Sequence, residues 1–119
     1  TRIRTQVRGH EIVCDQPAPR GEDLAPTPSE LLAASLAACT AYYVGLGAQK
    51  IGLAADQIEV TVEAEPASDP ARFGSFRLRL TLPPELDDAA RTRLERYAQL
   101  CFVKGTLQHT PQISLEIVQ

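Results

Sequence analysis

Three cysteines, Cys14, Cys39 and Cys101, are the residues of this sequence with the most direct capacity for chemistry. A thiolate is a nucleophile, and its sulfur can be oxidised and joined to a second sulfur. Three is an odd and low number for a secreted disulfide scaffold, and no pair has the CxxC spacing of a zinc site. His10 and His109 stand apart from each other and from the cysteines. We therefore expect no metal site.

Cys39 lies in AACTAYY and Cys101 in QLCFVKGTL. Each could be an inert core residue, because free cysteine is among the most buried residue types. The alternative is a thiol that reacts with peroxide, together with a resolving partner. Only about 3% of a thiol with a pKa near 8.5 is ionised at pH 7, so a donor must stabilise the thiolate. Arg8 and Arg20 are both candidates for that donor. Cys14 is interpreted as structural.

The segment TPSE predicts the start of a helix, with Thr27 as N-cap, Pro28 at the first helical position and Glu30 completing a capping box. The capping box is sufficient to explain Glu30. Nine residues turn a helix by about 900°, so Glu30 and Cys39 point to nearly opposite sides. Direct participation of Glu30 in the chemistry stays an open alternative.

The helix is expected to continue to about Lys50, and Leu31–Gln49 carries no charge. A membrane span is the alternative, but small residues dominate this stretch and no stop-transfer pattern flanks it. We therefore expect a central helix that is buried on most sides and that lets neighbouring elements approach closely. No membrane is expected as a partner.

Alternating apolar and polar residues predict five strands. A second helix is predicted because positions 90, 94, 97, 98 and 101 fall on one apolar helical face. The acidic outer face of the third strand can pair with the basic outer face of the fourth. The expected fold class is α+β, in the order β-β-α-β-β-α-β. The strands are Thr1–Arg8, His10–Cys14, Gln57–Glu65, Phe73–Leu82 and Ile113–Ile117, and the second helix runs from about Asp87 to Leu100.

Length and composition suit one globular domain over residues 1–119. The chain has 119 residues, 44% of them apolar and 23% charged, with a net charge of −3. This charge gives no basic footprint, so nucleic acid is not an expected partner. No signal peptide opens the sequence, and a reduced, cytoplasmic compartment is expected.

The segment from His10 to Leu53, with its Asp-x-Pro stretch, Gly-containing loop, Pro-x-acidic-Leu-Leu helix start and helical Ala-Cys-Thr, resembles the OsmC/Ohr family. The resemblance continues in QLCFVKGTL, where a second cysteine is followed by Val and Thr-Leu. It covers nearly the whole chain. It implies an antiparallel sheet with a long central helix and an intertwined homodimer.

The resemblance also implies a function, namely thiol-dependent reduction of organic hydroperoxides in oxidative stress defence. Cys39 matches the peroxidatic cysteine and Cys101 the resolving cysteine. The implied cycle passes from a Cys39 thiolate to a sulfenic acid, then to a Cys39–Cys101 disulfide, and a dithiol reductant restores the thiols. No metal, haem or flavin is implied.

The sequence departs from the family pattern at three points. Ser29 stands where the best-known members have an acidic residue, while Glu30 fits another branch; Phe102 replaces a frequent proline; and the activating arginine has no clear match. These departures leave open a non-catalytic OsmC-like domain that binds a small apolar ligand or senses oxidants through Cys39. A pure interaction module is a third class, and only the uncharged helix supports it.

Overall fold

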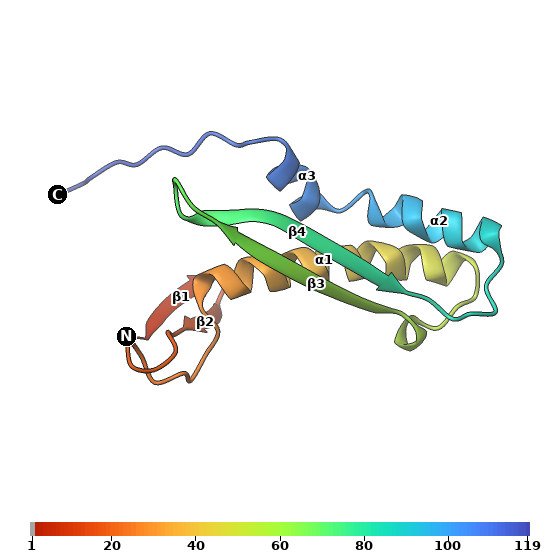
Figure 1. Cartoon of the computed structure of the whole chain (residues 1–119), viewed down its shortest axis with the longest axis horizontal. Helices are drawn as coiled ribbons and strands as arrows, with labels where there is room; N and C mark the ends of the chain where they lie inside the picture. Colours follow the sequence, from red (N-terminus) through yellow and green to blue (C-terminus); the bar gives the residue numbers. More distant parts are fainter. Residues whose placement is uncertain (1) are drawn as a thin grey trace.

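The computed structural model describes residues 2–119 and contains two β-hairpins and three α-helices (Figure 1). The first hairpin precedes the long helix α1, and the second lies along one side of it. Helices α2 and α3 follow the second hairpin and pack against α1. The elements are β1 Ile3–Val7, β2 His10–Cys14, α1 Pro28–Lys50, a short 3-10 turn η1 Ala55–Gln57, β3 Glu59–Ala67, β4 Arg72–Thr81, α2 Asp88–Ala98 and α3 Phe102–Gln108.

Helix α1 begins where the capping motif predicts. The Thr27 hydroxyl accepts the Glu30 N–H at 3.1 Å, and the Glu30 carboxylate accepts the Thr27 N–H at 2.9 Å. A capping threonine contributes about 1 kcal/mol relative to alanine. Pro28 occupies the first turn, where its missing N–H leaves no helical bond unmade. The start of the helix was therefore correctly predicted.

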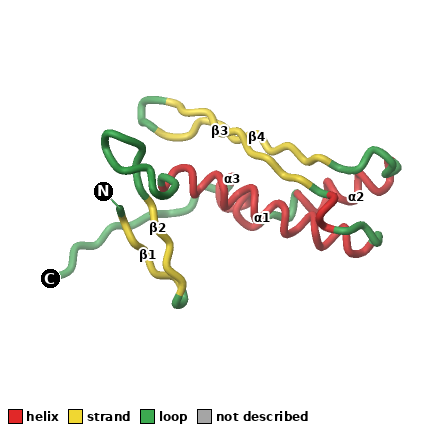
Figure 2. Tube along the Cα trace, turned by 90° about the horizontal axis from the view of Figure 1, so that it is seen from below, coloured by secondary structure: helices red, strands yellow, loops and turns green. Residues whose placement is uncertain are grey.

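The two hairpins form separate two-stranded antiparallel sheets (Figure 2). In the β3–β4 ladder Glu63 lies opposite Arg77, and Arg79 reaches diagonally to the Glu63 carboxylate at 3.3 Å. The opposite face of this hairpin carries the alternating apolar residues. The predicted pairing of an acidic strand face with a basic one is confirmed.

The core lies between the C-terminal half of α1, helix α2 and the nearby end of the β3–β4 sheet. Val44, Ala48 and Leu94 are fully buried and form its centre. A Cβ at Gly47 would lie 2.6 Å from the Tyr97 ring and 3.1 Å from a Leu94 methyl. Helices α1 and α2 can therefore approach closely only because position 47 has no side chain. This supports the expectation that small residues in the long helix allow close packing.

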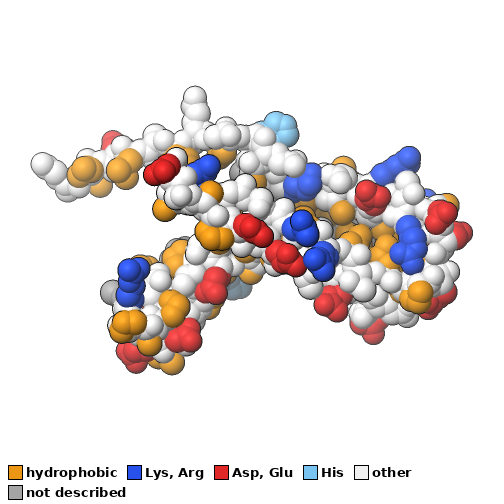
Figure 3. Space-filling model, in the orientation of Figure 1, with side chains coloured by type: hydrophobic (Ala, Val, Ile, Leu, Met, Phe, Trp, Pro, Cys, Tyr) orange, Lys and Arg blue, Asp and Glu red, His pale blue; other side chains and the backbone are white. Residues whose placement is uncertain are grey.

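The predicted strand Ile113–Ile117 is not formed in the single chain, so this prediction is wrong for the chain by itself. Residues 109–119 have no regular structure, and hydrophobic side chains lie along this extended segment (Figure 3). Ile113, Leu115 and Ile117 are each at least 90% exposed. An alternating segment becomes a strand only when a neighbouring strand supplies hydrogen bonds, and no described strand lies beside it. The element before it is helix α3, which the sequence reading did not predict. Gly105 lies inside that helix rather than ending it.

The burial of α1 also differs from the prediction. The buried residues follow one row, Leu36, Thr40, Val44, Gly47 and Ala48, whereas other faces of the helix carry exposed apolar side chains. Strand β1 is likewise exposed along its whole length. Of the described helices, α1 is long and apolar enough to cross a membrane by length and composition, a test that core helices of soluble proteins also pass. The expectation of burial on most sides is therefore not met within one chain.

Candidate functional site

The two cysteines singled out from the sequence lie together, 62 positions apart in the chain. Cys39 projects from the middle of α1, and Cys101 is the N-cap of α3, which packs on α1. The side chains of Cys39 and Cys101 lie close enough to interact. Both are free thiols; Cys101 is 2% exposed and Cys39 is partly exposed. The more accessible sulfur is therefore the one matched to the peroxidatic role.

Helix α2 and the turn after it bring Cys101 to α1. Leu94 packs in the core and holds α2 against α1. A tight turn follows α2, in which the Leu100 N–H donates to the Tyr97 carbonyl at 3.0 Å and the Cys101 N–H to the Ala98 carbonyl at 3.3 Å. The Cys101 sulfur then accepts the Lys104 N–H at 3.4 Å. Cysteine thus takes the capping place that serine or threonine usually occupies.

The environment of Cys101 stabilises its thiolate. Burial raises the pKa of the Cys101 thiol, but the Lys104 N–H, the interactions with the Cys39 and Thr40 side chains and the Val103 N–H together outweigh burial, so that the pKa lies below its ordinary value. A larger thiolate fraction at neutral pH follows. The sequence predicted a stabilised thiolate at Cys39, and it gave no indication of this set of groups around Cys101.

The other candidate residues are not brought to the sulfur pair within this chain. Glu30 is held in the capping box, and the Thr27 N–H and hydroxyl lower the pKa of its carboxyl. It lies nine residues from Cys39, about 13.5 Å along the helix axis. Arg8 is exposed at the turn between β1 and β2, at the end of the hairpin away from α1 (Figure 2). Arg20 lies in the exposed loop that precedes α1.

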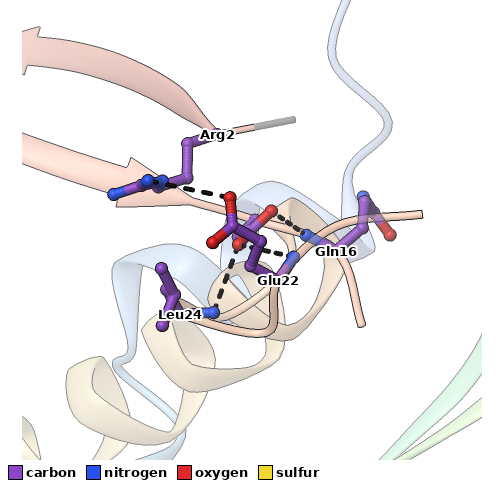
Figure 4. A network of polar contacts seen from close by, with 5 residues as sticks. Arg2, Gln16, Glu22 and Leu24 are labelled. Carbon is purple, nitrogen blue, oxygen red and sulfur yellow. Dashed lines mark hydrogen bonds and ion pairs between the residues drawn. The ribbon is translucent and has the colours of Figure 1, made fainter. Parts of the chain in front are cut away.

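The loop between β2 and α1 is held together by Asp15, whose role was not predicted from the sequence. Its carboxylate is buried and accepts the N–H groups of Gln16 at 2.8 Å and of Glu22 and Leu24 at 3.2 Å (Figure 4). A Cβ at Gly21 would lie 2.3 Å from the same carboxylate. The loop therefore folds back tightly on the end of β2, which fixes the start of α1. The Asp-x-Pro pattern together with Gly21 is the signal that could have indicated it.

Asp15 should make the stability of the protein depend on pH. Backbone hydrogen bonds from Gln16 and Leu24 hold the pKa of its carboxyl below 3.8 in the fold. A depressed pKa contributes stability that is present above the unfolded value and is lost as pH falls through the folded value. We expect Asp15→Asn to lower the melting temperature by several degrees at about pH 7, with a smaller gap from wild type below about pH 3. An equal gap at both pH values in thermal unfolding would contradict this role.

Two cavities lie beside the sulfur pair, between the apolar face of β3–β4 and the helices. The first, of about 460 Å³, is bordered by Thr40 and Lys104, which both contact Cys101, and by the apolar side chains of Val60, Leu78 and Leu80 among others. The second, of about 380 Å³, also borders Lys104 and includes Leu36, Phe73, Phe76 and Leu107. The second cavity is mostly apolar, whereas the first combines apolar side chains with the charged side chains of Arg79, Arg91 and Glu95, so an organic molecule with a polar end suits them.

The chain thus combines an α+β fold built on one long helix with two free thiols that lie side by side. The family model described as OsmC-like protein matches residues 21–116, and the chain belongs to this family. The recognition from sequence and the fold class are thereby confirmed. No curated protein is a significant match to the chain.

Solved structures agree with this assignment. A protein from Psychrobacter arcticus 273-4, described as a candidate osmotic stress induced and detoxification response protein, is 26% identical with a TM-score of 0.73. The match covers 89% of this chain and 86% of that one. An organic hydroperoxide resistance protein OsmC from Legionella pneumophila is 21% identical with a TM-score of 0.58. That match covers 92% and 90% of the two chains. At this identity the second likeness shows the fold.

Proposed function

We propose that this single OsmC-like domain is a thiol peroxidase that reduces organic hydroperoxides and protects the cell against oxidative stress. The observation that carries the proposal is that Cys39 and Cys101, both free thiols, lie side by side where α3 packs on α1. A peroxidatic cycle needs one accessible sulfur and a second sulfur within reach, because the oxidised form must be resolved. Membership of the OsmC-like family supports the proposal.

The proposed reaction has two steps on the protein. The Cys39 thiolate attacks the terminal oxygen of a hydroperoxide; an S–O bond forms, the O–O bond breaks, and the leaving alkoxide takes a proton to become an alcohol. The Cys101 sulfur then attacks the Cys39 sulfur, an S–S bond forms, and the hydroxyl group leaves with the Cys101 proton as water. A dithiol reductant restores both thiols by exchange. The free thiols and this recycling suit the reducing conditions of the cytoplasm.

The apolar cavities give the substrate's organic group a place near the sulfurs. Thr40 and Lys104 connect the larger cavity with Cys101, so a bound apolar chain could extend from the reacting oxygen along the sheet face. The same cavities are what favours the second candidate, a non-catalytic domain that binds a small apolar ligand or senses oxidants through Cys39. The two candidates differ in whether stoichiometric peroxide consumes the thiols.

We also propose that the working form is a homodimer. The chain exposes 9225 Å², whereas a compact monomer of 12.9 kDa exposes about 6300 Å². Its radius of gyration of 17.4 Å likewise exceeds the roughly 13.5 Å expected for a compact chain of this length. The excess area is of the size that obligate dimers bury. A second copy covering the free faces of α1, β1 and the C-terminal segment would account for it.

A thiol count tests the proposed activity. Reduced protein treated with one equivalent of tert-butyl hydroperoxide is expected to lose two free thiols and two hydrogen atoms by intact mass, with peptide mapping locating the bond between Cys39 and Cys101. Release of an equivalent of tert-butanol should accompany the loss. Unchanged thiols at stoichiometric peroxide would overturn the peroxidase and leave the ligand-binding alternative.

A further inference from the structure

Thr40 is the polar member of the buried row of α1. Its neighbours in that row, Leu36, Val44 and Ala48, are apolar, and its own side chain is only 2% exposed. A buried hydroxyl is costly unless it is hydrogen-bonded, and valine or alanine would fill such a position without that requirement. Thr40 Oγ1 donates to the Leu36 carbonyl at 2.9 Å, which satisfies the hydroxyl locally but gives no reason for its presence.

The second partner of Thr40 supplies that reason. Its side chain lies within interaction range of the Cys101 sulfur, which accepts the Lys104 N–H at 3.4 Å and also lies close to Cys39. The Cys101 sulfur is thus held by groups from both α1 and α3 in a setting that is almost closed to water. Thr40 stands directly after Cys39 in the chain, so one helical segment presents both the reacting sulfur and a hydroxyl to Cys101.

A hydroxyl has one hydrogen and two lone pairs, so it can serve both protonation states of Cys101. While Cys101 is a thiol, Thr40 Oγ1 can accept its S–H and still donate to the Leu36 carbonyl. When Cys101 loses its proton, rotation of the hydroxyl lets it donate to the sulfur. The Leu36 carbonyl then still accepts the backbone N–H that lies four residues later in the helix.

This inference rests on the proposed function: we infer that Thr40 is a positioning residue for the second step of the reaction. Its hydroxyl holds the Cys101 sulfur against Cys39 and stabilises that sulfur as it attacks. In that step the S–S bond forms, the S–O bond of the Cys39 sulfenic acid breaks, and water leaves with the Cys101 proton. Thr40 is not consumed. Charged groups also border the cavity next to Thr40, and they are Arg79, Arg91, Glu95 and Lys104.

The test compares Thr40→Val, which keeps the shape and removes the hydroxyl, with Thr40→Ser, which restores it. After rapid mixing with tert-butyl hydroperoxide, Cys39 sulfenic acid and the disulfide are followed separately by quenching and mass spectrometry. We expect Thr40→Val to slow disulfide formation about fivefold, the effect of losing one ordinary hydrogen bond, and to shift the pH midpoint of Cys101 alkylation upward. Sulfenic acid should form at nearly the wild-type rate.

Thr40→Ser is expected to recover most of the rate and the original midpoint. Ser35→Ala is the matched control, because Ser35 donates to the Leu32 carbonyl at 2.7 Å on an exposed part of the same helix. The inference is overturned if Thr40→Val keeps both the second-step rate and the Cys101 midpoint, or if Thr40→Ser is as slow as Thr40→Val. A wild-type protein that forms no sulfenic acid would instead overturn the proposed peroxidase, and the alkylation midpoints, measured without peroxide, would still decide the role of Thr40.

Discussion

Cys39→Ser is expected to abolish the reduction of organic hydroperoxides, with turnover falling by at least about 10³-fold, because a serine hydroxyl cannot take up the peroxide oxygen as a sulfur does. Cys101→Ser should behave differently. Its Cys39 is still expected to react once and to gain one oxygen atom, since the accessible sulfur is unchanged. The disulfide cannot form, so sulfenic acid should accumulate and then oxidise further to sulfinic acid under excess peroxide.

The measurement is peroxide consumption with a dithiol reductant, combined with intact mass after one equivalent of peroxide. Cys14→Ser is the matched control, because Cys14 is a buried free thiol at the end of β2 with no part in the proposed cycle. It should retain both steps. If Cys101→Ser turned over like wild type, Cys101 would have no resolving role. If the first oxygen appeared on Cys101 in Cys39→Ser, the two roles would be reversed.

The features that depend on neighbouring residues in the sequence were predicted well. Thr27 and Glu30 mark the helix start because a capping box involves only four consecutive residues. The β3–β4 hairpin follows from strict alternation over two adjacent segments. The two cysteine contexts were located through the family resemblance, and the fold then brings both sulfurs to the junction of α1 and α3.

The features that depend on distant residues were missed for physical reasons. Helix α3 contains Gly105 and Thr106, which disfavour an isolated helix, and it forms where it packs on α1. The burial of Asp15 depends on three N–H groups that face inward only once the loop has closed. Thr40 looks like any polar residue on a helix until Cys101 lies against it. Local periodicity contains none of these contacts.

The C-terminal segment combines both kinds of feature: its alternation is local, but no described strand of this chain pairs with it. Ile113, Leu115 and Ile117 alternate with polar residues along this segment and are exposed. Hydrophobic side chains rarely stay exposed together in a finished assembly. A strand that is predicted from sequence but unpaired in the monomer is what an intertwined dimer would produce, since a second copy supplies the edge.

Replacing Ile113, Leu115 and Ile117 together by serine is therefore expected to weaken the proposed homodimer by at least about 10³-fold in dissociation constant. Each buried apolar side chain contributes roughly 1.5–3 kcal/mol, and 1.4 kcal/mol corresponds to a factor of ten. The matched control changes the other face of the same segment, with Gln112, Ser114 and Glu116 replaced by alanine, and should remain dimeric. Light scattering at micromolar concentration measures both variants.

The experiment tests two questions separately: whether the protein is a dimer, and whether the C-terminal segment forms the interface. A wild-type mass near 12.9 kDa would refute the dimer. A dimeric triple-serine variant would instead place the interface on α1 and β1, whose apolar residues are also exposed. If the segment does pair with a second copy, Cys39 and Cys101 should still form a disulfide in the monomeric variant, because both sulfurs belong to one chain. Loss of peroxide reduction in that variant would then mean that the second copy supplies a group that the first step requires, such as an arginine beside Cys39.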